Sequence, residues 1–256
     1  MKTRIIAVSN IKGGVGKTTT VVNLAAGLAH YGRRVLVIDA DAQANATFAF
    51  CGAERPERTL FDVLIANTAS LPEIITRTQT PGVDLAPSQI SLSAADLALA
   101  SVPGRERLLA RRLRDVTGYD YIFIDTPPAL SLLSVNSFTS ASEIFVPVST
   151  GVFALLGIPL LEQAIAQLRE NLEMDTPVIS GAIATLYDRT RVADDTLRAM
   201  HEHFGTRLFN TIIPKYKDIQ ESQSRAQSIF QYAPASPAAI AFYALIEEVI
   251  HGEKDD

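Results

Sequence analysis

Short apolar runs rich in isoleucine and valine recur along the chain, separated by segments long enough to form helices. Several runs are apolar at every position, as expected for strands that are buried on both faces. Long connections between such strands favour crossover helices and parallel pairing. The pattern therefore predicts an α/β fold, a doubly wound and mostly parallel sheet with helices on both faces. The expected strands are Ile5–Val8, Val35–Ile38, Val83–Ala86, Tyr121–Ile124, Ile144–Val148, Val178–Leu186 and Leu208–Ile213.

Three further segments carry apolar residues at helical spacing, namely Thr18–Tyr31, Phe153–Leu172 and Ala238–Ile250. Gly32 is predicted to end the first of them. No long linker, low-complexity tract or internal period interrupts the 256 residues. We therefore expect one domain over residues 1–252, followed by a polar tail over residues 253–256.

Composition excludes several classes of protein. The chain is 47% hydrophobic and 20% charged, which rules out wholesale disorder. Its net charge of -5 disfavours nucleic-acid binding over the whole surface but leaves room for a local basic patch. The single cysteine, Cys51, excludes an intramolecular disulfide and fits a reducing, cytoplasmic compartment. No apolar stretch approaches the roughly 20 residues that span a bilayer.

A glycine-rich segment, Ser9–Thr20, follows the first expected strand and leads into the first expected helix. In this arrangement backbone amides and the helix dipole converge on a place where a phosphate can bind. Lys17 would lie near the outer phosphates, and the Thr18 hydroxyl would ligate Mg²⁺. A plain tight turn is the simpler reading of isolated glycines, but the flanking strand and helix favour a triphosphate site. Its predicted residues are Gly13, Gly14, Val15, Gly16, Lys17, Thr18 and Thr19.

Carboxylates end two of the expected strands. Asp39 and Asp41 follow the second run, and Asp125 ends the run at Tyr121–Ile124. Because parallel strands end at one edge of a sheet, these groups are expected beside the phosphate loop. Asp125, at the end of a buried strand, is predicted to serve the magnesium shell through water. An aspartate at a strand end also commonly caps a helix or forms a turn.

The loop has Ile11 where the common phosphate-loop pattern has glycine, and Lys12 follows it. The resulting run, Lys-Gly-Gly-x-Gly-Lys-Thr, resembles the deviant Walker A motif of the ParA/MinD/nitrogenase iron protein superfamily. The resemblance implies ATP with Mg²⁺, and a catalytic Lys12 that reaches across a homodimer interface to the partner's nucleotide. Cations between two facing nucleotides make electrostatic sense. Outside this motif, Lys12 would be read as a solvated surface charge.

Two further segments extend the resemblance. Residues 39–43, Asp-Ala-Asp-Ala-Gln, resemble the family's switch I, which implies that Asp41 orients and activates the attacking water while Asp39 supports the loop. Ala42 and Ala44 stand where many partition ATPases have proline and glycine. Residues 125–128 resemble the family's Walker B segment, with switch II expected over residues 130–142.

The resemblance also implies contacts near the end of the chain. The loop after the last strand lies against adenine in the family, which indicates Pro214 and Tyr216, although asparagine is usual where Tyr216 stands. Asp218 stands where relatives commonly have arginine, and Glu221 also interrupts the basic cluster, so a solvated mixed-charge face is the alternative to DNA binding. The candidate DNA contacts are Arg189, Arg191, Lys215, Lys217 and Arg225.

Absences narrow the choice within the superfamily. Cys51 alone cannot ligate an iron-sulfur cluster, and Glu247 and Glu248 argue against a basic membrane-anchoring helix. The chain is thus identified as ParA-type, which implies an ATP-dependent homodimer that binds DNA non-specifically. The protein would segregate DNA or position a cargo on the nucleoid, and a ParB-like or other adaptor protein would stimulate its slow hydrolysis of ATP. Positioning of a protein cargo without DNA is the first alternative, and a metabolic ligase or kinase resembling dethiobiotin synthetase is the second.

Overall fold

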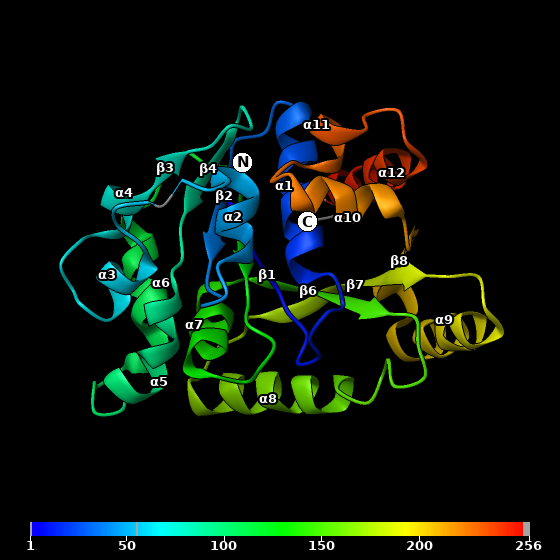
Figure 1. Cartoon of the computed structure of the whole chain (residues 1–256). Helices are drawn as coiled ribbons and strands as arrows, with labels where there is room; N and C mark the ends of the chain where they lie inside the picture. Colours follow the sequence, from blue (N-terminus) through cyan, green and yellow to red (C-terminus); the bar gives the residue numbers. More distant parts are fainter. Residues whose placement is uncertain (1, 55, 253–256) are drawn as a thin grey trace.

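The computed structural model describes residues 2–54 and 56–252. Within them an eight-stranded sheet has the order β3-β4-β2-β5-β1-β6-β7-β8 (Figure 1). All neighbouring strands pair in parallel except β3, which runs antiparallel to β4. The strands are β1 (Arg4–Val8), β2 (Val35–Asp39), β3 (Thr76–Arg77), β4 (Val83–Ala86), β5 (Tyr121–Asp125), β6 (Glu143–Ser149), β7 (Val178–Tyr187) and β8 (Leu208–Pro214).

Helices cover both faces of this sheet. They are α1 (Lys17–His30), α2 (Asn45–Cys51), α3 (Leu60–Leu64), α4 (Leu71–Ile74), α5 (Ala95–Ala98), α6 (Leu108–Arg112), α7 (Leu132–Ser140), α8 (Ile158–Asn171), α9 (Arg191–Phe204), α10 (Lys217–Ser224), α11 (Ile229–Tyr232) and α12 (Pro237–His251). One apolar core joins one face of the sheet to α3, α6, α7, α8 and α9, and a second joins the other face to α1, α2, α11 and α12 (Figure 1). Short 3₁₀ turns lie at Ile90–Ala94, Arg105–Arg107, Leu113–Asp115 and Gly205–Arg207.

The predicted α/β class is confirmed, and each of the seven expected strands is present with both ends within one residue of those expected. β2 and β5 are buried at every position, as their uniformly apolar sequences require. The edge strand β3 was not predicted, because it has only two residues, Thr76 and Arg77, and neither is apolar.

Two of the three expected helices, α1 and α12, are confirmed, and Gly32 has a left-handed φ of 76° just beyond α1. The expected helix over Phe153–Leu172 begins too early and is corrected to α8, which starts at Ile158. Pro159 has no amide hydrogen and fits only in the first turn of a helix, so the preceding residues form turns instead. Consequently Leu156 is exposed and does not belong to the apolar face of α8.

The parallel pairing brings the site residues to one edge of the sheet. Val8 and Asp39 both lie in register with Asp125, so β1, β2 and β5 end side by side. The loops that follow these three strands therefore share one edge, as expected for a ligand site in an open α/β sheet. No helix in the described ranges is long and apolar enough to cross a membrane. The predicted polar tail, residues 253–256, lies outside the described residues.

Candidate nucleotide-binding site

The loop between β1 and α1 is held open by its own backbone and by neighbouring strands. Gly14 and Gly16 have left-handed φ values of 71° and 89°, which side chains rarely tolerate, and Gly16 is the N-cap of α1. The Thr185 hydroxyl donates to the Val15 carbonyl at 2.8 Å. Asn10 accepts from the Lys12 amide through its side-chain oxygen at 3.0 Å. The loop amides are thus fixed around the N-terminus of a 14-residue helix.

The two lysines of this loop have different surroundings. Lys17 is 8% exposed, and its ammonium donates to the Lys12 carbonyl at 3.1 Å. Burial lowers the pKa of Lys17, and the nearby Asp125 and Asp41 carboxylates oppose that shift. Lys12, in contrast, is exposed to solvent. One ammonium is therefore kept at the phosphate loop, whereas the other is free to reach outward.

The residues predicted to hold Mg²⁺ lie in contact. The Thr18 hydroxyl donates to one carboxylate oxygen of Asp125 at 2.7 Å. The other oxygen of Asp125 is buried and has no hydrogen-bond partner in the described part of the chain. Burial and the neighbouring Asp39 raise the pKa of Asp125 well above its usual range. An unpaired buried oxygen beside a hydroxyl fits a hydrated Mg²⁺, which takes few protein ligands and completes its shell with water and phosphate.

Asp39 and Asp41 have separate surroundings after β2. Asp39 is fully buried and accepts from the Asp41 amide, the Thr47 amide and the Thr47 hydroxyl. Burial raises the pKa of Asp39 to about 7, although the Thr47 hydrogen bonds oppose this shift. Asp41 accepts from the Gln43 amide at 3.0 Å and faces the cavity described next. Asp39 thus has the contacts of a loop support, whereas Asp41 lines the cavity.

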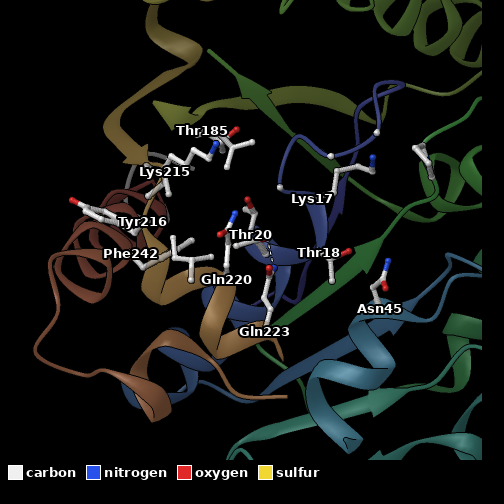
Figure 2. A pocket seen from close by; sticks show the side chains of 18 of the residues that line it. Lys17, Thr18, Thr20, Asn45, Thr185, Lys215, Tyr216, Gln220, Gln223 and Phe242 are labelled. Atoms are coloured by element: carbon white, nitrogen blue, oxygen red, sulfur yellow. Dashed lines mark hydrogen bonds between the residues drawn. The ribbon is translucent and has the colours of Figure 1, made fainter. Parts of the chain in front are cut away.

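A cavity of about 440 Å³ joins the phosphate loop to the end of β8. Figure 2 shows Lys17, Thr18 and Asn45 at one end and Lys215, Tyr216 and Phe242 at the other. Most of the predicted nucleotide-binding residues share this lining, namely Gly13, Gly14, Gly16, Lys17, Thr18, Thr19, Asp41, Pro214 and Tyr216. The positions of these side chains suit a nucleotide with phosphates at the loop and the base near Tyr216.

Several lining residues were not predicted. Gln223 on α10 donates to the Thr19 hydroxyl at 2.6 Å and so crosses from the C-terminal part of the chain to α1 (Figure 2). Gln220 and Phe242 also line the cavity, from α10 and α12. Helical periodicity in α10 would have placed Gln220 and Gln223 on one face, since they are three residues apart. Nothing in the sequence alone indicates that this face meets α1.

The five basic residues predicted to bind DNA lie at or next to helix ends, since Arg191 begins α9, Lys217 begins α10, and Arg225 follows α10. The Lys215 amide donates to the Tyr187 carbonyl, which brings the loop that carries Arg189 and leads to Arg191 at the start of α9 beside the end of β8. Lys215 itself lines the nucleotide cavity. Lys217 pairs with Glu221 at 2.7 Å, and Arg225 lies over the Tyr232 ring. Glu221 thus neutralises part of the basic cluster.

Comparison with known proteins identifies relatives over nearly the whole chain. The AAA_31 family, described as an AAA domain, matches residues 3–177. The chromosome-partitioning ATPase Soj of Thermus thermophilus is 38% identical, with 97% of this chain and 96% of that protein covered. The chromosome partitioning protein ParA of Caulobacter vibrioides is 35% identical, with 98% and 96% covered.

A solved structure extends the likeness to bound ligands. The structure named cobyrinic acid a,c-diamide synthase from Mycobacterium smegmatis, with ADP and magnesium, has a TM-score of 0.85 and 30% identity, and covers 99% of this chain and 96% of its own. ATP and Mg²⁺ are therefore the ligands of this fold, as the phosphate loop predicts. The chain belongs to the ParA/Soj family of partition ATPases.

Proposed function

We propose that this protein is an ATP-driven switch that dimerises with ATP, binds DNA non-specifically, and segregates or positions DNA or a large cargo over the nucleoid. Slow hydrolysis, accelerated by an adaptor protein of ParB type, would dissolve the dimer and release the DNA. The observation that carries the proposal is the pair of lysines in one loop: Lys17 is buried and bonded at the phosphate site, whereas Lys12 is exposed beside it.

The geometry supports a role for each residue. Lys17 and the loop amides would bind the β- and γ-phosphates, and Lys12 would cross to the partner's triphosphate, where two sets of anionic charge meet. Mg²⁺ at Thr18 and Asp125 would supply charge neutralisation of the phosphates. Asp41 faces the cavity at the phosphate end and would orient the attacking water. Tyr216 and Pro214 would contact the base at the opposite end.

DNA binding is proposed for the loops before α9 and α10 together with the first residues of these helices, and for Arg225. These segments carry Arg189, Arg191, Lys215 and Lys217. The contact of Lys215 with Tyr187 joins two of these loops into one surface. Dimerisation would double that surface, which adds phosphate contacts and makes binding weaken steeply as salt rises. Because Lys215 also lines the nucleotide cavity, occupancy of that cavity and DNA contact would be linked through one loop.

Size-exclusion chromatography with ATP or ADP tests the switch. We expect wild type and Asp41→Ala to elute as dimers with ATP and as monomers with ADP, with hydrolysis lost in Asp41→Ala. Lys12→Ala should bind ATP and stay monomeric, whereas Lys2→Ala, which removes an exposed lysine at the other end of β1, should behave as wild type. A monomer in both nucleotides, or Asp41→Ala that hydrolyses ATP at the wild-type partner-stimulated rate, would contradict the proposal.

A second candidate function, positioning of a protein cargo without DNA, is favoured by the acidic groups among the basic residues. Glu221 pairs with Lys217, and Asp188 has its pKa lowered by hydrogen bonds from Thr190 and by the nearby Lys215. A plasmid shift assay at low salt separates the two candidates. A shift that requires ATP and disappears with ADP supports DNA binding, whereas no shift in either nucleotide favours the protein cargo.

A further inference from the structure

The segment that follows β4 reaches the loop that carries Asp41. β4 pairs in parallel with β2, and Ala86 lies opposite Ile38. The chain just beyond Ala86 therefore lies beside the chain just beyond Ile38. Ser88, two residues past the end of β4, is 4% exposed and donates its hydroxyl to the Asp41 carbonyl at 2.7 Å.

The chain turns at residues 41–44, which we call the Asp41 turn. The Ser88 hydroxyl belongs to a closed ring of hydrogen bonds around this turn. The Ser88 amide donates to the Thr47 hydroxyl at 2.8 Å. That hydroxyl donates in turn to the Asp39 carboxylate at 2.7 Å, and Asp39 accepts from the Asp41 amide. The turn is thus held from β2 through Asp39, from α2 through Thr47, and from the β4 segment through Ser88. All four residues are buried.

The backbone conformation of the Asp41 turn is energetically unfavourable by itself. Ala44, whose amide donates to the Asp41 carbonyl at 2.9 Å, has a left-handed φ of 54°. A residue with a side chain occupies this region only where its surroundings impose it. A bond from outside the turn to the carbonyl of Asp41 therefore bears directly on where the Asp41 carboxylate lies.

We propose that Ser88 is a positioning residue for ATP hydrolysis, which fixes the Asp41 turn through the main-chain carbonyl of Asp41. The inference rests on the proposed role of Asp41. Among the described residues, the hydrogen bonds of Ser88 go to Thr47 and Asp41, and Ser88 does not line the nucleotide cavity. Its hydroxyl therefore acts on hydrolysis through Asp41 and not on nucleotide binding. Misplacement of a reacting group by about 1 Å can reduce a rate up to about 100-fold.

The test is Ser88→Ala, which removes the hydroxyl and keeps the hydrogen bond from the main-chain amide of residue 88 to the Thr47 hydroxyl. Single-turnover hydrolysis of ATP by excess protein should slow about tenfold, while the Kd for ATP changes less than twofold. Ser88→Thr keeps a hydroxyl and should restore most of the rate. Thr3→Val is the matched control, since the Thr3 hydroxyl donates to the Tyr119 carbonyl at 2.7 Å at the opposite edge of the sheet. Its hydrolysis rate should equal that of wild type.

A wild-type hydrolysis rate in Ser88→Ala would overturn the inference. Equal losses of rate and ATP affinity in Ser88→Ala, or a loss of rate in Thr3→Val of the same size, would also overturn it, because both results indicate general destabilisation. If wild type itself does not hydrolyse ATP, or if Asp41→Ala hydrolyses as fast as wild type, the proposed function fails instead.

Discussion

Replacing Asp125 by asparagine should change the stability of the free protein and its response to Mg²⁺ in opposite directions. Asp125 is fully buried, one of its oxygens has no partner among the described residues, and the other accepts only the neutral Thr18 hydroxyl. The raised pKa of this carboxyl has burial as its largest cause. Asparagine keeps the shape and an acceptor for Thr18, and its amide NH2 would also lack a partner, but it has no charge to desolvate.

The expected gain follows from the charge on that unpaired oxygen, since a neutral amide group in the same place also lacks a partner but is less costly to bury. Leaving a buried polar group without a partner costs about 1–3 kcal/mol, and more when the group is charged. At pH 8 the cost is present whether the buried carboxyl keeps its charge or takes up a proton, since the unfolded chain exposes a hydrated carboxylate. For a domain of this size, 1 kcal/mol shifts the melting temperature by about 2–4 °C. Asp125→Asn should therefore melt about 5 °C above wild type without nucleotide.

With Mg²⁺ and nucleotide bound, wild type should no longer melt below Asp125→Asn. A ligand at 100 times its Kd stabilises the native state by about 2.7 kcal/mol, which corresponds to a rise of about 5–10 °C in melting temperature. In wild type this rise with a non-hydrolysable ATP analogue should require Mg²⁺. In Asp125→Asn the Mg²⁺-dependent part should disappear, so that wild type with Mg²⁺ and nucleotide melts at or above the variant.

Thermal melting with EDTA, with Mg²⁺, and with Mg²⁺ plus the analogue provides the assay. Asp120→Asn is the matched control, because it removes a carboxylate at the opposite end of the same strand, where Asp120 accepts from the Arg34 amide at 2.8 Å. Its nucleotide response should match wild type. The reasoning is refuted if free Asp125→Asn melts below wild type, or if its Mg²⁺-dependent shift is unchanged.

Three further substitutions should change the free energy of unfolding or the affinity for ATP in a direction that the structure predicts. Gly27→Ala in α1 should lower the free energy of unfolding, measured in urea, by about 1–2 kcal/mol, because the added Cβ would lie 2.0 Å from the end of the Ile246 side chain. This overpacking outweighs the gain in helix propensity of about 1 kcal/mol. Ala44→Gly should raise the free energy of unfolding by about 0.5–1 kcal/mol in the same assay, because glycine removes the cost of a left-handed φ. Tyr216→Ala should weaken ATP binding about tenfold in calorimetry, since base stacking on an aromatic ring contributes about 1–3 kcal/mol, whereas Tyr31→Ala, on α1's far end, should leave the Kd unchanged.

The sequence predicted the parts of the site that strand order determines. Asp39, Asp41 and Asp125 each follow a run of buried apolar residues, and parallel pairing brings such strand ends to one edge. The glycines and Lys17 are likewise local to one strand-loop-helix unit. These predictions needed no knowledge of how distant segments pack.

Other features depend on tertiary contacts that no local pattern reports. Gln223 meets Thr19 across 204 residues, and Ser88 meets Asp41 across 47. A serine after a strand, or a glutamine on a polar helix face, is unremarkable in sequence. The early start predicted for α8 failed for a different reason, since Phe153 and Leu156 continue the helical spacing although Pro159 sets where a helix can begin.

The conformation of the turn that carries Asp41 depends both on its local sequence and on tertiary contacts. The sequence has Ala44 where many partition ATPases have glycine, and the structure nevertheless keeps a left-handed φ at that residue. The alanine therefore adds a conformational cost that the hydrogen bonds of Asp39, Thr47 and Ser88 must offset. In such a turn the position of the carboxylate follows from the neighbouring segments more than from the turn's own preference. A movement of the segment after β4 would then be transmitted to Asp41 and, given the proposed role of Asp41, would change the rate of hydrolysis from outside the nucleotide cavity.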